Sequence, residues 1–280
     1  MPQYSFRILN VFAETPLGGN PLAVFEDAVG MDDATMQALA LQFNLSETTF
    51  ILPSATATAR VRIFTPTFEM PFAGHPTLGT AQVVQSLKNC GEQLTLEMQA
   101  GLIPVNLADG VWTLTAAAPT TNVPHSSRAE LAQALGLNEH DIGATSLWVN
   151  TGSDQLVIPL TSAGAVRRCQ PDAALMQRYC NNGKRVLAYV WASSGAQEAQ
   201  VRFFFDKHGS VLEDPGTGSA CANLGGYLLA TGRKGPLAWT LHQGDQIGRP
   251  CVLKLTLGAD DAIQVGGRVV DLGRGQITLP

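Results

Sequence analysis

The sequence predicts an α+β fold of two similar domains, each a curved β-sheet or barrel around one central helix. Two observations lead to this prediction. The two halves of the 280-residue chain align with each other at an offset of about 140 residues. Segments with strand character outnumber those with helical character, and in each half one apolar helix rich in small residues follows a Gly/Pro-rich turn.

The internal alignment is most extensive around the two turns. It places ARVRIFTPTFEMPFAGHPTLGTAQVVQSL over AQVRFFFDKHGSVLEDPGTGSACANLGGYLL, so that Arg62 meets Arg202. With one residue dropped, His75 falls on Asp214. A period of half the chain is too long for a solenoid, so the alignment indicates an internal duplication. Chance similarity between two strand-turn-helix units is the alternative.

Both halves contain the same local pattern. Alternating polar and apolar side chains in RVRIF and QVRFFF predict half-buried strands. The runs TLGTAQVVQSLK and GSACANLGGYLLA are apolar or small nearly all round, which predicts buried helices. Helices are also predicted at TMQALALQF, LMQRYCNNG and the serine-capped SSRAELAQALGL. Further strands are predicted at PLAVF, TTFIL, LTLEM, WTLTAA, QLVIPL, VLAYVWA, VLKLTL and IQVGGRVV.

A Pro-, Asn- and Ser-rich stretch from Ala117 to Glu130 is expected to link the two halves. The predicted N-terminal domain therefore spans residues 1–118 and the predicted C-terminal domain spans residues 119–269. A last strand near residues 270–280 could return to the first domain.

Charge and composition exclude several classes of function. The net charge of -5 gives no basic field for nucleic acid, and no segment reaches the ~18 apolar residues of a membrane-spanning helix. The first residues lack the pattern of a secretory signal. Five widely spaced cysteines without a C-x-x-C pair predict neither disulfides nor a zinc site, which favours a cytoplasmic location.

The two glycine-rich turns, Pro71 to Ala81 and Val211 to Ala220, are the candidate functional segments. A helix N-terminus presents free N–H groups that bind anions, and glycine lets a ligand approach the backbone. If an approximate two-fold axis relates the domains, both helices would point at one cleft and hold a carboxylate or an enolate-like oxygen. His75 and Asp214 would then be acid/base groups at its lip, with the Ser219 hydroxyl in a first helical turn.

Four segments, in this order, resemble the signature blocks of the phenazine-biosynthesis PhzF-like proteins, relatives of diaminopimelate epimerase: NVFAETPLGGNPLAVF, NLSETTFIL, RIFTPTFEMPFAGHPTLGTA and EDPGTGSA. The resemblance covers almost the whole chain. It implies two similar domains with the active site between them, and a homodimer. It also implies a cofactor-free isomerisation, in which a carboxylate removes a proton from carbon and a protonated neighbour returns one elsewhere on the same molecule.

The resemblance also implies the catalytic residues. Glu47 is the implied proton-shuttling glutamate, and His75, Asp214 and Ser219 are the other implied catalytic residues. The implied substrate is a small cyclic or unsaturated carboxylic acid, which in the name-giving branch of the family is a dihydro-hydroxyanthranilate. No cofactor and no metal are expected.

Substrate-binding residues are expected at the two turns and in the GGN segment. Gly74 and Gly218 would offer N–H groups to developing negative charge, and Thr217 and Asn20 complete the expected set. The segment HQGDQIGRP, at residues 242–250, resembles a further family block that could line the cleft.

Two other functions remain open. An amino-acid racemase or epimerase of this fold would use two opposed cysteines, whereas Cys221 has no cysteine counterpart in the first half, where Gln82 takes its place. A non-catalytic or metal-dependent binding protein could use Glu47, His75 and Asp214 as ligands.

Other residues near these motifs have no predicted catalytic role. Glu69 has no counterpart carboxylate in the internal alignment and is expected to be a surface or turn residue. Gly216 stands where the family often has alanine, so the substrate preference could differ. Candidate aromatic walls of the site are Phe12, Phe43, Phe50, Phe72 and Tyr227.

Overall fold

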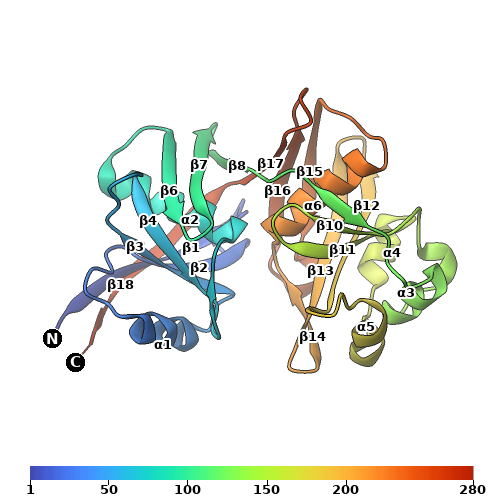
Figure 1. Cartoon of the computed structure of the whole chain (residues 1–280), viewed down its shortest axis with the longest axis horizontal. Coiled ribbons are helices and arrows are strands. Elements are labelled where there is room, and N and C mark those ends of the chain that lie inside the picture. Colours follow the sequence, from blue (N-terminus) through green and yellow to red (C-terminus); the bar gives the residue numbers. More distant parts are fainter. Residues whose placement is uncertain (280) are drawn as a thin grey trace. The chain divides into compact units, whose positions relative to one another are not determined.

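The computed structural model describes residues 1–279, which form a mixed α/β fold with more strands than helices (Figure 1). The chain divides into two compact units. Unit 1 comprises residues 1–115 together with the C-terminal residues from 266 onward, and unit 2 comprises residues 116–265. The interpretation of these units as duplicated epimerase-like domains stays a prediction.

Unit 1 is built on a strand-rich framework with two helices among its described residues. Its elements are β1 (Gln3–Val11), β2 (Asn20–Phe25), α1 (Asp33–Phe43), β3 (Glu47–Leu52), β4 (Ala59–Phe64), β5 (Glu69–Met70), α2 (Gly74–Lys88), β6 (Gln93–Met98), β7 (Gly101–Ala108), β8 (Val111–Thr115) and β18 (Val269–Thr278). Strand β17 (Ile263–Gly267) starts in unit 2 and ends in unit 1.

The sheet of unit 1 curves around α2. Strand β1 pairs antiparallel with β18 and β2, β2 pairs parallel with β3, and β4 joins β3 to β6, which continues through β7 and β8. Helix α2 contacts β1, β2, β3, β4, β6, β8 and β18. The helix is therefore buried on almost every side of its first turns, as its sequence predicts.

Gly79 shows why α2 needs small residues. A Cβ atom at this position would lie 2.5 Å from Leu22 Cδ2 and 2.9 Å from Val11 Cγ2. These distances are shorter than van der Waals contact, so only glycine lets α2 lie this close to β1 and β2.

Helix α1 packs on an aromatic cluster and ends just before the candidate glutamate. Phe43 on α1 meets the Phe25 ring edge-on at 5.7 Å, and Phe25 stacks on Phe50 at 4.8 Å. Asn44 closes α1 with a left-handed conformation at φ 50°, so the chain turns directly into β3.

Most of the predicted aromatic walls belong to the core. Phe12 and Phe50 are fully buried, Tyr227 is 3% exposed, and Phe43 packs against the α1 cluster. Phe72 is partly exposed and does not belong to the α1 cluster. Because large apolar rings are buried in folding whether or not a ligand is present, their sequence positions did not distinguish core from site.

Unit 2 repeats the combination of a sheet and one buried helix, and adds three short helices. Its elements are β9 (Thr120–Asn122), α3 (Arg128–Ala134), β10 (Leu147–Asn150), β11 (Asp154–Pro159), α4 (Ala163–Arg168), α5 (Ala173–Tyr179), β12 (Leu187–Gly195), β13 (Glu198–Lys207), β14 (Ser210–Asp214), α6 (Gly218–Ala230), β15 (Leu237–Gln243) and β16 (Cys251–Leu257), with 3-10 turns η1 (Glu139–Asp141) and η2 (Asp245–Ile247).

The two faces of the unit 2 sheet have different partners. Alternate residues of β12 point to opposite faces, so Val190 joins the cluster under α3, α4 and α5 while Trp191 meets Tyr227 of α6. Helix α6 also contacts β9, β10, β11 and β16 and is buried over most of its length. The small residues of GSACANLGGYLLA therefore form a core helix, as predicted.

The remaining sequence predictions of local structure are mostly confirmed. The serine cap of α3 is present, with Ser127 and Glu130 forming a capping box. The expected linker contains β9, which pairs with β10, and the predicted strand at residues 263–270 is interrupted at Arg268. Helix α4 was not predicted. No helix among the described residues is long and apolar enough to cross a membrane.

In each unit, an arginine on one strand of a β-hairpin forms a two-bond ion pair with a glutamate on the other strand. In unit 1, Arg62 Nε lies 2.8 Å from Glu69 Oε1 and its Nη2 lies 2.6 Å from Oε2. In unit 2, Arg202 Nε lies 3.1 Å from Glu213 Oε1 and its Nη2 lies 2.7 Å from Oε2. The expectation that Glu69 has no counterpart is therefore wrong, because Glu213 occupies the same place in its own hairpin.

This correspondence also changes the pairing of the two helix starts. Helix α2 begins at Gly74, five residues after Glu69, and α6 begins at Gly218, five residues after Glu213. By distance from the paired glutamate, His75 matches Ser219 in position and Asp214 does not, so the hairpins do not support the predicted alignment of His75 with Asp214. The paired arginine and glutamate are 7 residues apart in unit 1 and 11 residues apart in unit 2. The hairpin of unit 2 is thus four residues longer, whereas the sequence alignment had dropped one residue of unit 1.

Candidate active site

Glu47 and His75 lie together in unit 1. Glu47 is the first residue of β3 and His75 is the second residue of α2, so the curved sheet and its central helix bring the two side chains together. Glu47 Oε2 is 3.1 Å from His75 Nδ1, and the side chains are 16% and 5% exposed. The pair is therefore close and largely shielded from water.

The Glu47 carboxylate retains free accepting capacity. The distance to His75 lies within hydrogen-bonding range, but Glu47 Oε2 is buried without a hydrogen bond of acceptable geometry. Burying such an oxygen costs free energy unless a partner arrives. The side chain as a whole keeps 16% of its surface exposed, so a bound molecule would reach the carboxylate through its other oxygen, Oε1.

Hydrogen bonds fix β3 against α2 behind the pair. Thr49, two residues after Glu47, shares a buried hydrogen bond of 2.8 Å with Thr80 on α2. The Thr77 hydroxyl donates to the Ala73 carbonyl at 2.6 Å in the first turn. The first bond joins the strand that carries Glu47 to α2, and the second lies within the turn of α2 that carries His75.

Gly74 and Asn20 occupy the beginnings of two elements in the same unit. Gly74 opens α2, and the N-cap residue Ala73 provides no side-chain hydrogen bond to the first turn. Asn20 is the first residue of β2 and is 1% exposed. Gly19 before it has φ 79°, and a Cβ there would lie 2.7 Å from Ala13 Cβ, so the GGN segment is a turn that requires glycine.

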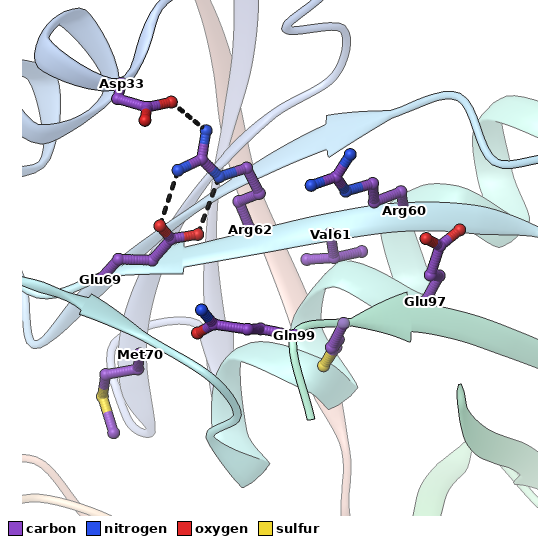
Figure 2. Close-up of a pocket in the computed structure, with 9 residues that line it drawn as sticks. Asp33, Arg60, Val61, Arg62, Glu69, Met70, Glu97 and Gln99 are labelled. Atoms are coloured by element: carbon purple, nitrogen blue, oxygen red, sulfur yellow. Dashed lines mark hydrogen bonds and ion pairs between the residues drawn. The ribbon is translucent and has the colours of Figure 1, made fainter. Parts of the chain in front are cut away.

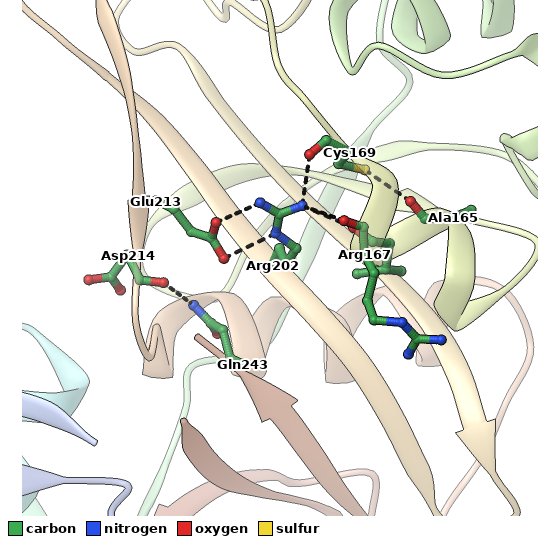
Figure 3. A network of polar contacts seen from close by, with 8 residues as sticks. Ala165, Arg167, Cys169, Arg202, Glu213, Asp214 and Gln243 are labelled. Atoms are coloured by element: carbon green, nitrogen blue, oxygen red, sulfur yellow. Dashed lines mark hydrogen bonds and ion pairs between the residues drawn. The ribbon is translucent and has the colours of Figure 1, made fainter. Parts of the chain in front are cut away.

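Asp214 and Thr217 form a second cluster in unit 2. Asp214 ends β14 and Thr217 is the N-cap residue of α6. The Thr217 hydroxyl donates to Asp214 Oδ2. Gln243, fully buried at the end of β15, donates to the Asp214 carbonyl at 2.8 Å (Figure 3). It also donates to Thr217 Oγ1 at 3.0 Å.

The direction of these hydrogen bonds follows from the backbone. The Thr217 N–H can only donate, and it points to Gln243 Oε1 at 3.2 Å, so the Gln243 amide nitrogen faces Asp214 and the Thr217 hydroxyl. The hydroxyl accepts from Gln243 and gives its own hydrogen to Asp214. Gln243 was missed as an individual residue, although its segment was recognised as a possible site lining.

Arg202 anchors the strand that ends at Asp214. It pairs with Glu213, and its Nη1 donates to the carbonyls of Val166, Arg167 and Cys169 at the end of α4 (Figure 3). Because Glu213 directly precedes Asp214, this buried ion pair restrains the backbone that carries the candidate catalytic carboxylate.

Ser219 and Gly218 open helix α6. Ser219 is partly exposed and its Oγ accepts a hydrogen bond of 2.9 Å from Gln155 Nε2. Cys221, two residues further, is fully buried, and burial raises the pKa of its thiol. A thiol that stays protonated is a poor base, so the start of α6 offers a hydroxyl and not a reactive cysteine.

The structure thus places the predicted residues in two groups, each within one unit. Glu47, His75 and Gly74 belong to unit 1, and Asp214, Thr217, Gly218 and Ser219 belong to unit 2. Within residues 1–279, no group of three His, Cys, Asp or Glu side chains is arranged to hold a metal ion.

A polar hollow of about 430 Å³ on unit 1 does not contain any predicted site residue (Figure 2). Its centre is Arg62, which binds Glu69 and also Asp33 at 2.5 Å. Arg62, Glu69 and Asp33 are already paired with one another and the hollow is open to solvent, so it resembles a solvated surface feature. Its lining residues are Asp33, Arg60, Val61, Arg62, Glu69, Met70, Glu97, Met98 and Gln99.

Comparison of the whole fold with solved structures gives similar proteins of two kinds. A PhzF-family phenazine biosynthesis protein of Bacillus anthracis superposes with a TM-score of 0.87 at 22% identity, covering 100% of both chains. A hydroxyproline epimerase of Agrobacterium vitis superposes with a TM-score of 0.64 at 12% identity, covering 99% of this chain and 93% of the epimerase. At these identities the likeness concerns the fold alone.

Sequence relatives establish the family. An uncharacterised isomerase of Pasteurella multocida is 45% identical over 280 residues, covering 99% of this chain and 95% of the relative. A trans-2,3-dihydro-3-hydroxyanthranilate isomerase of Pseudomonas fluorescens is 34% identical over 289 residues, covering 99% and 100%. The family described as phenazine biosynthesis-like protein matches residues 9–275. The chain is therefore a member of the PhzF family of phenazine biosynthesis-like isomerases.

Proposed function

We propose that this isomerase catalyses a cofactor-independent proton shift on a small cyclic or unsaturated carboxylic acid. In this proposal the two groups of residues act on one substrate molecule in a cleft between two similar, duplicated domains. The observation that carries it is the Glu47 carboxylate, which is 16% exposed and whose buried Oε2 lies 3.1 Å from His75 Nδ1. The exposed part of this carboxylate would accept the proton from carbon, with His75 behind it.

The proposed step moves one proton within the substrate. Glu47 takes a proton from one carbon, the electron pair of the broken C–H bond shifts the neighbouring double bond, and a proton is returned to another carbon. His75 is the adjacent group that would exchange protons with Glu47 or the substrate. No electrons are gained or lost overall, so the step requires no redox partner.

The unit 2 residues would bind and polarise the substrate. Asp214, held by Thr217 and Gln243, would accept a hydrogen bond or a proton from a polar substrate group, and the Ser219 hydroxyl would donate. The N–H groups of Gly74 and Gly218, at two helix N-termini, would stabilise negative charge that develops on the carboxylate as electrons move. Asn20 is the further proposed binding residue.

The named activity of relatives suggests the first substrate to test. Relatives that are 32–35% identical carry the name trans-2,3-dihydro-3-hydroxyanthranilate isomerase. That compound is a cyclic unsaturated acid, which agrees with a site that combines a buried base and two helix N-termini. A homodimer and a cytoplasmic location are further parts of the proposal and rest on the family resemblance and the composition.

A two-thiol racemase is not favoured. The equivalent second positions of α2 and α6 hold His75 and Ser219, and the nearby Cys221 is a fully buried thiol with a raised pKa. Neither position offers the thiolate that such a mechanism uses.

Deuterium uptake tests the proposal. The protein is incubated in deuterated water with trans-2,3-dihydro-3-hydroxyanthranilate and a panel of related acids, and uptake at carbon is followed by mass spectrometry. Glu47→Gln should abolish uptake, whereas Glu92→Gln, at an exposed position of the same unit, should leave it unchanged. Uptake that persists in Glu47→Gln would remove this residue from the proposed role.

A further inference from the structure

A buried chain of amides leads from the backbone of unit 2 to the Ser219 hydroxyl. The Thr151 N–H and Oγ1 both donate to Asn223 Oδ1, at 2.9 and 2.7 Å. Asn223 Nδ2 donates to Gln155 Oε1 at 2.7 Å, and Gln155 Nε2 donates to Ser219 Oγ at 2.9 Å. Asn223 is fully buried and Gln155 is 3% exposed.

Two backbone groups fix the direction of every bond in this chain. The Thr151 N–H can only donate, so the Asn223 atom facing it must be the oxygen. The Ser153 carbonyl can only accept, and it receives Asn223 Nδ2 at 2.8 Å. The amide of Asn223 therefore has one possible orientation, with its nitrogen toward Gln155.

Gln155 has one possible orientation as a consequence. The group that receives Asn223 Nδ2 must be the Gln155 oxygen, so the Gln155 nitrogen faces Ser219. Ser219 Oγ thus accepts from the protein. Within residues 1–279 this is the one hydrogen bond of the Ser219 side chain, so its hydroxyl hydrogen is left for another acceptor.

We propose that Gln155 and Asn223 are positioning residues that make the Ser219 hydroxyl an obligatory hydrogen-bond donor to an anionic oxygen of the substrate. This inference deepens the proposed function and rests on it. A hydroxyl can ordinarily donate or accept a hydrogen bond. A hydroxyl that is free to do either does not distinguish an anionic substrate oxygen from a substrate group that donates. The amide chain removes that freedom before the substrate binds, so no hydroxyl reorientation is needed as negative charge develops.

The fold alone does not require this chain. Asn223 lies four residues after Ser219 in α6, and Gly79 lies four residues after His75 in α2. Helix α2 is therefore buried with a glycine, and no amide side chain, at the matching position. Buried amides cost free energy unless every polar atom is paired, and an apolar side chain would avoid that requirement. In unit 2, every amide atom of Asn223 and Gln155 has a hydrogen-bond partner, and the chain ends at one partly exposed group, the Ser219 hydroxyl. We therefore infer that the chain acts on Ser219.

Gln155→Glu reverses the last bond without changing the shape. The carboxylate can only accept, so Ser219 would give its hydrogen to position 155 and turn its lone pairs to the substrate. We expect kcat/KM for proton exchange on trans-2,3-dihydro-3-hydroxyanthranilate to fall by about 10- to 100-fold. Protonation of the new carboxyl restores a donor, so the variant should recover activity as the pH is lowered, which a purely structural defect would not do.

Two further variants separate positioning from folding. Asn223→Asp keeps the acceptor for Thr151 but replaces the nitrogen that donates to Gln155 and to the Ser153 carbonyl with an oxygen. Gln155 would then turn its nitrogen toward position 223 and its oxygen toward Ser219, so the folded variant should show the same loss of activity, together with a loss of stability from the Ser153 contact. In a Ser219→Ala background, Gln155→Glu should have little further effect, because its action passes through that hydroxyl. Circular dichroism and thermal unfolding identify variants that fail to fold.

The outcomes distinguish this inference from the proposed function. Wild-type protein that exchanges no proton on this acid would contradict the proposed function. Normal wild-type exchange that is equally fast in folded Gln155→Glu, or additive effects of Gln155→Glu and Ser219→Ala, would overturn only the positioning role. Independently of any substrate, the Gln155 side-chain amide protons should exchange with solvent more slowly than those of exposed Gln93 in ¹⁵N NMR; equal rates would also overturn it.

Discussion

Arg202 forms a two-bond ion pair with Glu213, and this glutamate directly precedes the candidate catalytic residue Asp214 (Figure 3). The side chains are only 10% and 6% exposed, so each charge depends on the other for compensation. The same guanidinium group binds carbonyls at the end of α4. A single arginine thus connects a helix, two strands and the turn that leads into α6.

Replacing Arg202 with Met should destabilise the fold strongly. The variant leaves the Glu213 carboxylate buried without its partner, so we expect a loss of about 3–5 kcal/mol in the free energy of unfolding, measured by urea denaturation. Arg62→Met is the matched control, because its partners Glu69 and Asp33 are 28% and 83% exposed. It should cost about 1 kcal/mol. Equal losses in the two variants would contradict this assignment.

Gly79→Ala should destabilise unit 1 through overpacking. The added Cβ would meet Leu22 Cδ2 at 2.5 Å, so α2 or β2 must shift, at a cost of about 1–3 kcal/mol. Gly91→Ala, where a Cβ meets nothing within 4 Å, should change stability by less than about 0.5 kcal/mol. Thermal and urea unfolding of both variants measure the difference, and a neutral Gly79→Ala would show that α2 moves freely.

Gln243→Glu should reduce activity through Asp214. The substitution replaces the nitrogen that donates to the Asp214 carbonyl and to Thr217 with an oxygen, which repels the carbonyl and attracts the Thr217 hydrogen away from Asp214. We expect kcat to fall by about tenfold or more, with a loss of about 1–3 kcal/mol in stability. Gln99→Glu, at an exposed position, is the control. Unchanged kcat in a folded Gln243→Glu protein would show that Asp214 needs no such support.

The buried thiols should make stability depend on alkaline pH. Burial raises the pKa of Cys180 from 9.0 to about 12. A pKa that is higher in the folded state contributes stability that is complete below about pH 9 and is lost as the pH rises toward about 12. The stability difference between wild type and Cys180→Ala, measured by urea denaturation, should therefore shrink over this range. A constant difference would mean that the folded thiol titrates normally.

Thiol labelling offers a separate check on cysteine environments. Cys90 is partly exposed, whereas Cys169, Cys180, Cys221 and Cys251 are buried. At pH 8 the native protein should react quickly at one thiol, Cys90, and at the others only after unfolding. Mass spectrometry of the labelled peptides identifies the reactive position, and fast native labelling of Cys221 would reopen the racemase mechanism.

Local patterns in the sequence identified most elements and the candidate residues on them. The small-residue runs of α2 and α6 indicated buried helices, and TMQALALQF indicated α1, which ends just before Glu47. The motif order also indicated the family. The sequence did not reveal that the two hairpins match. The connection in unit 2 is four residues longer, and this shift becomes visible only when the structure pairs Arg202 with Glu213.

Sequence alone therefore determined which side chains are available: the ionisable groups of Glu47 and His75, a carboxylate at Asp214 and a hydroxyl at Ser219. Hydrogen-bond directions were decided only by tertiary structure. Gln155 and Gln243 are ordinary polar residues in strands until the fold brings backbone N–H and carbonyl groups against particular atoms of their networks. Because an amide can present either its oxygen or its nitrogen, its role depends on these distant neighbours and not on the residues beside it in the chain.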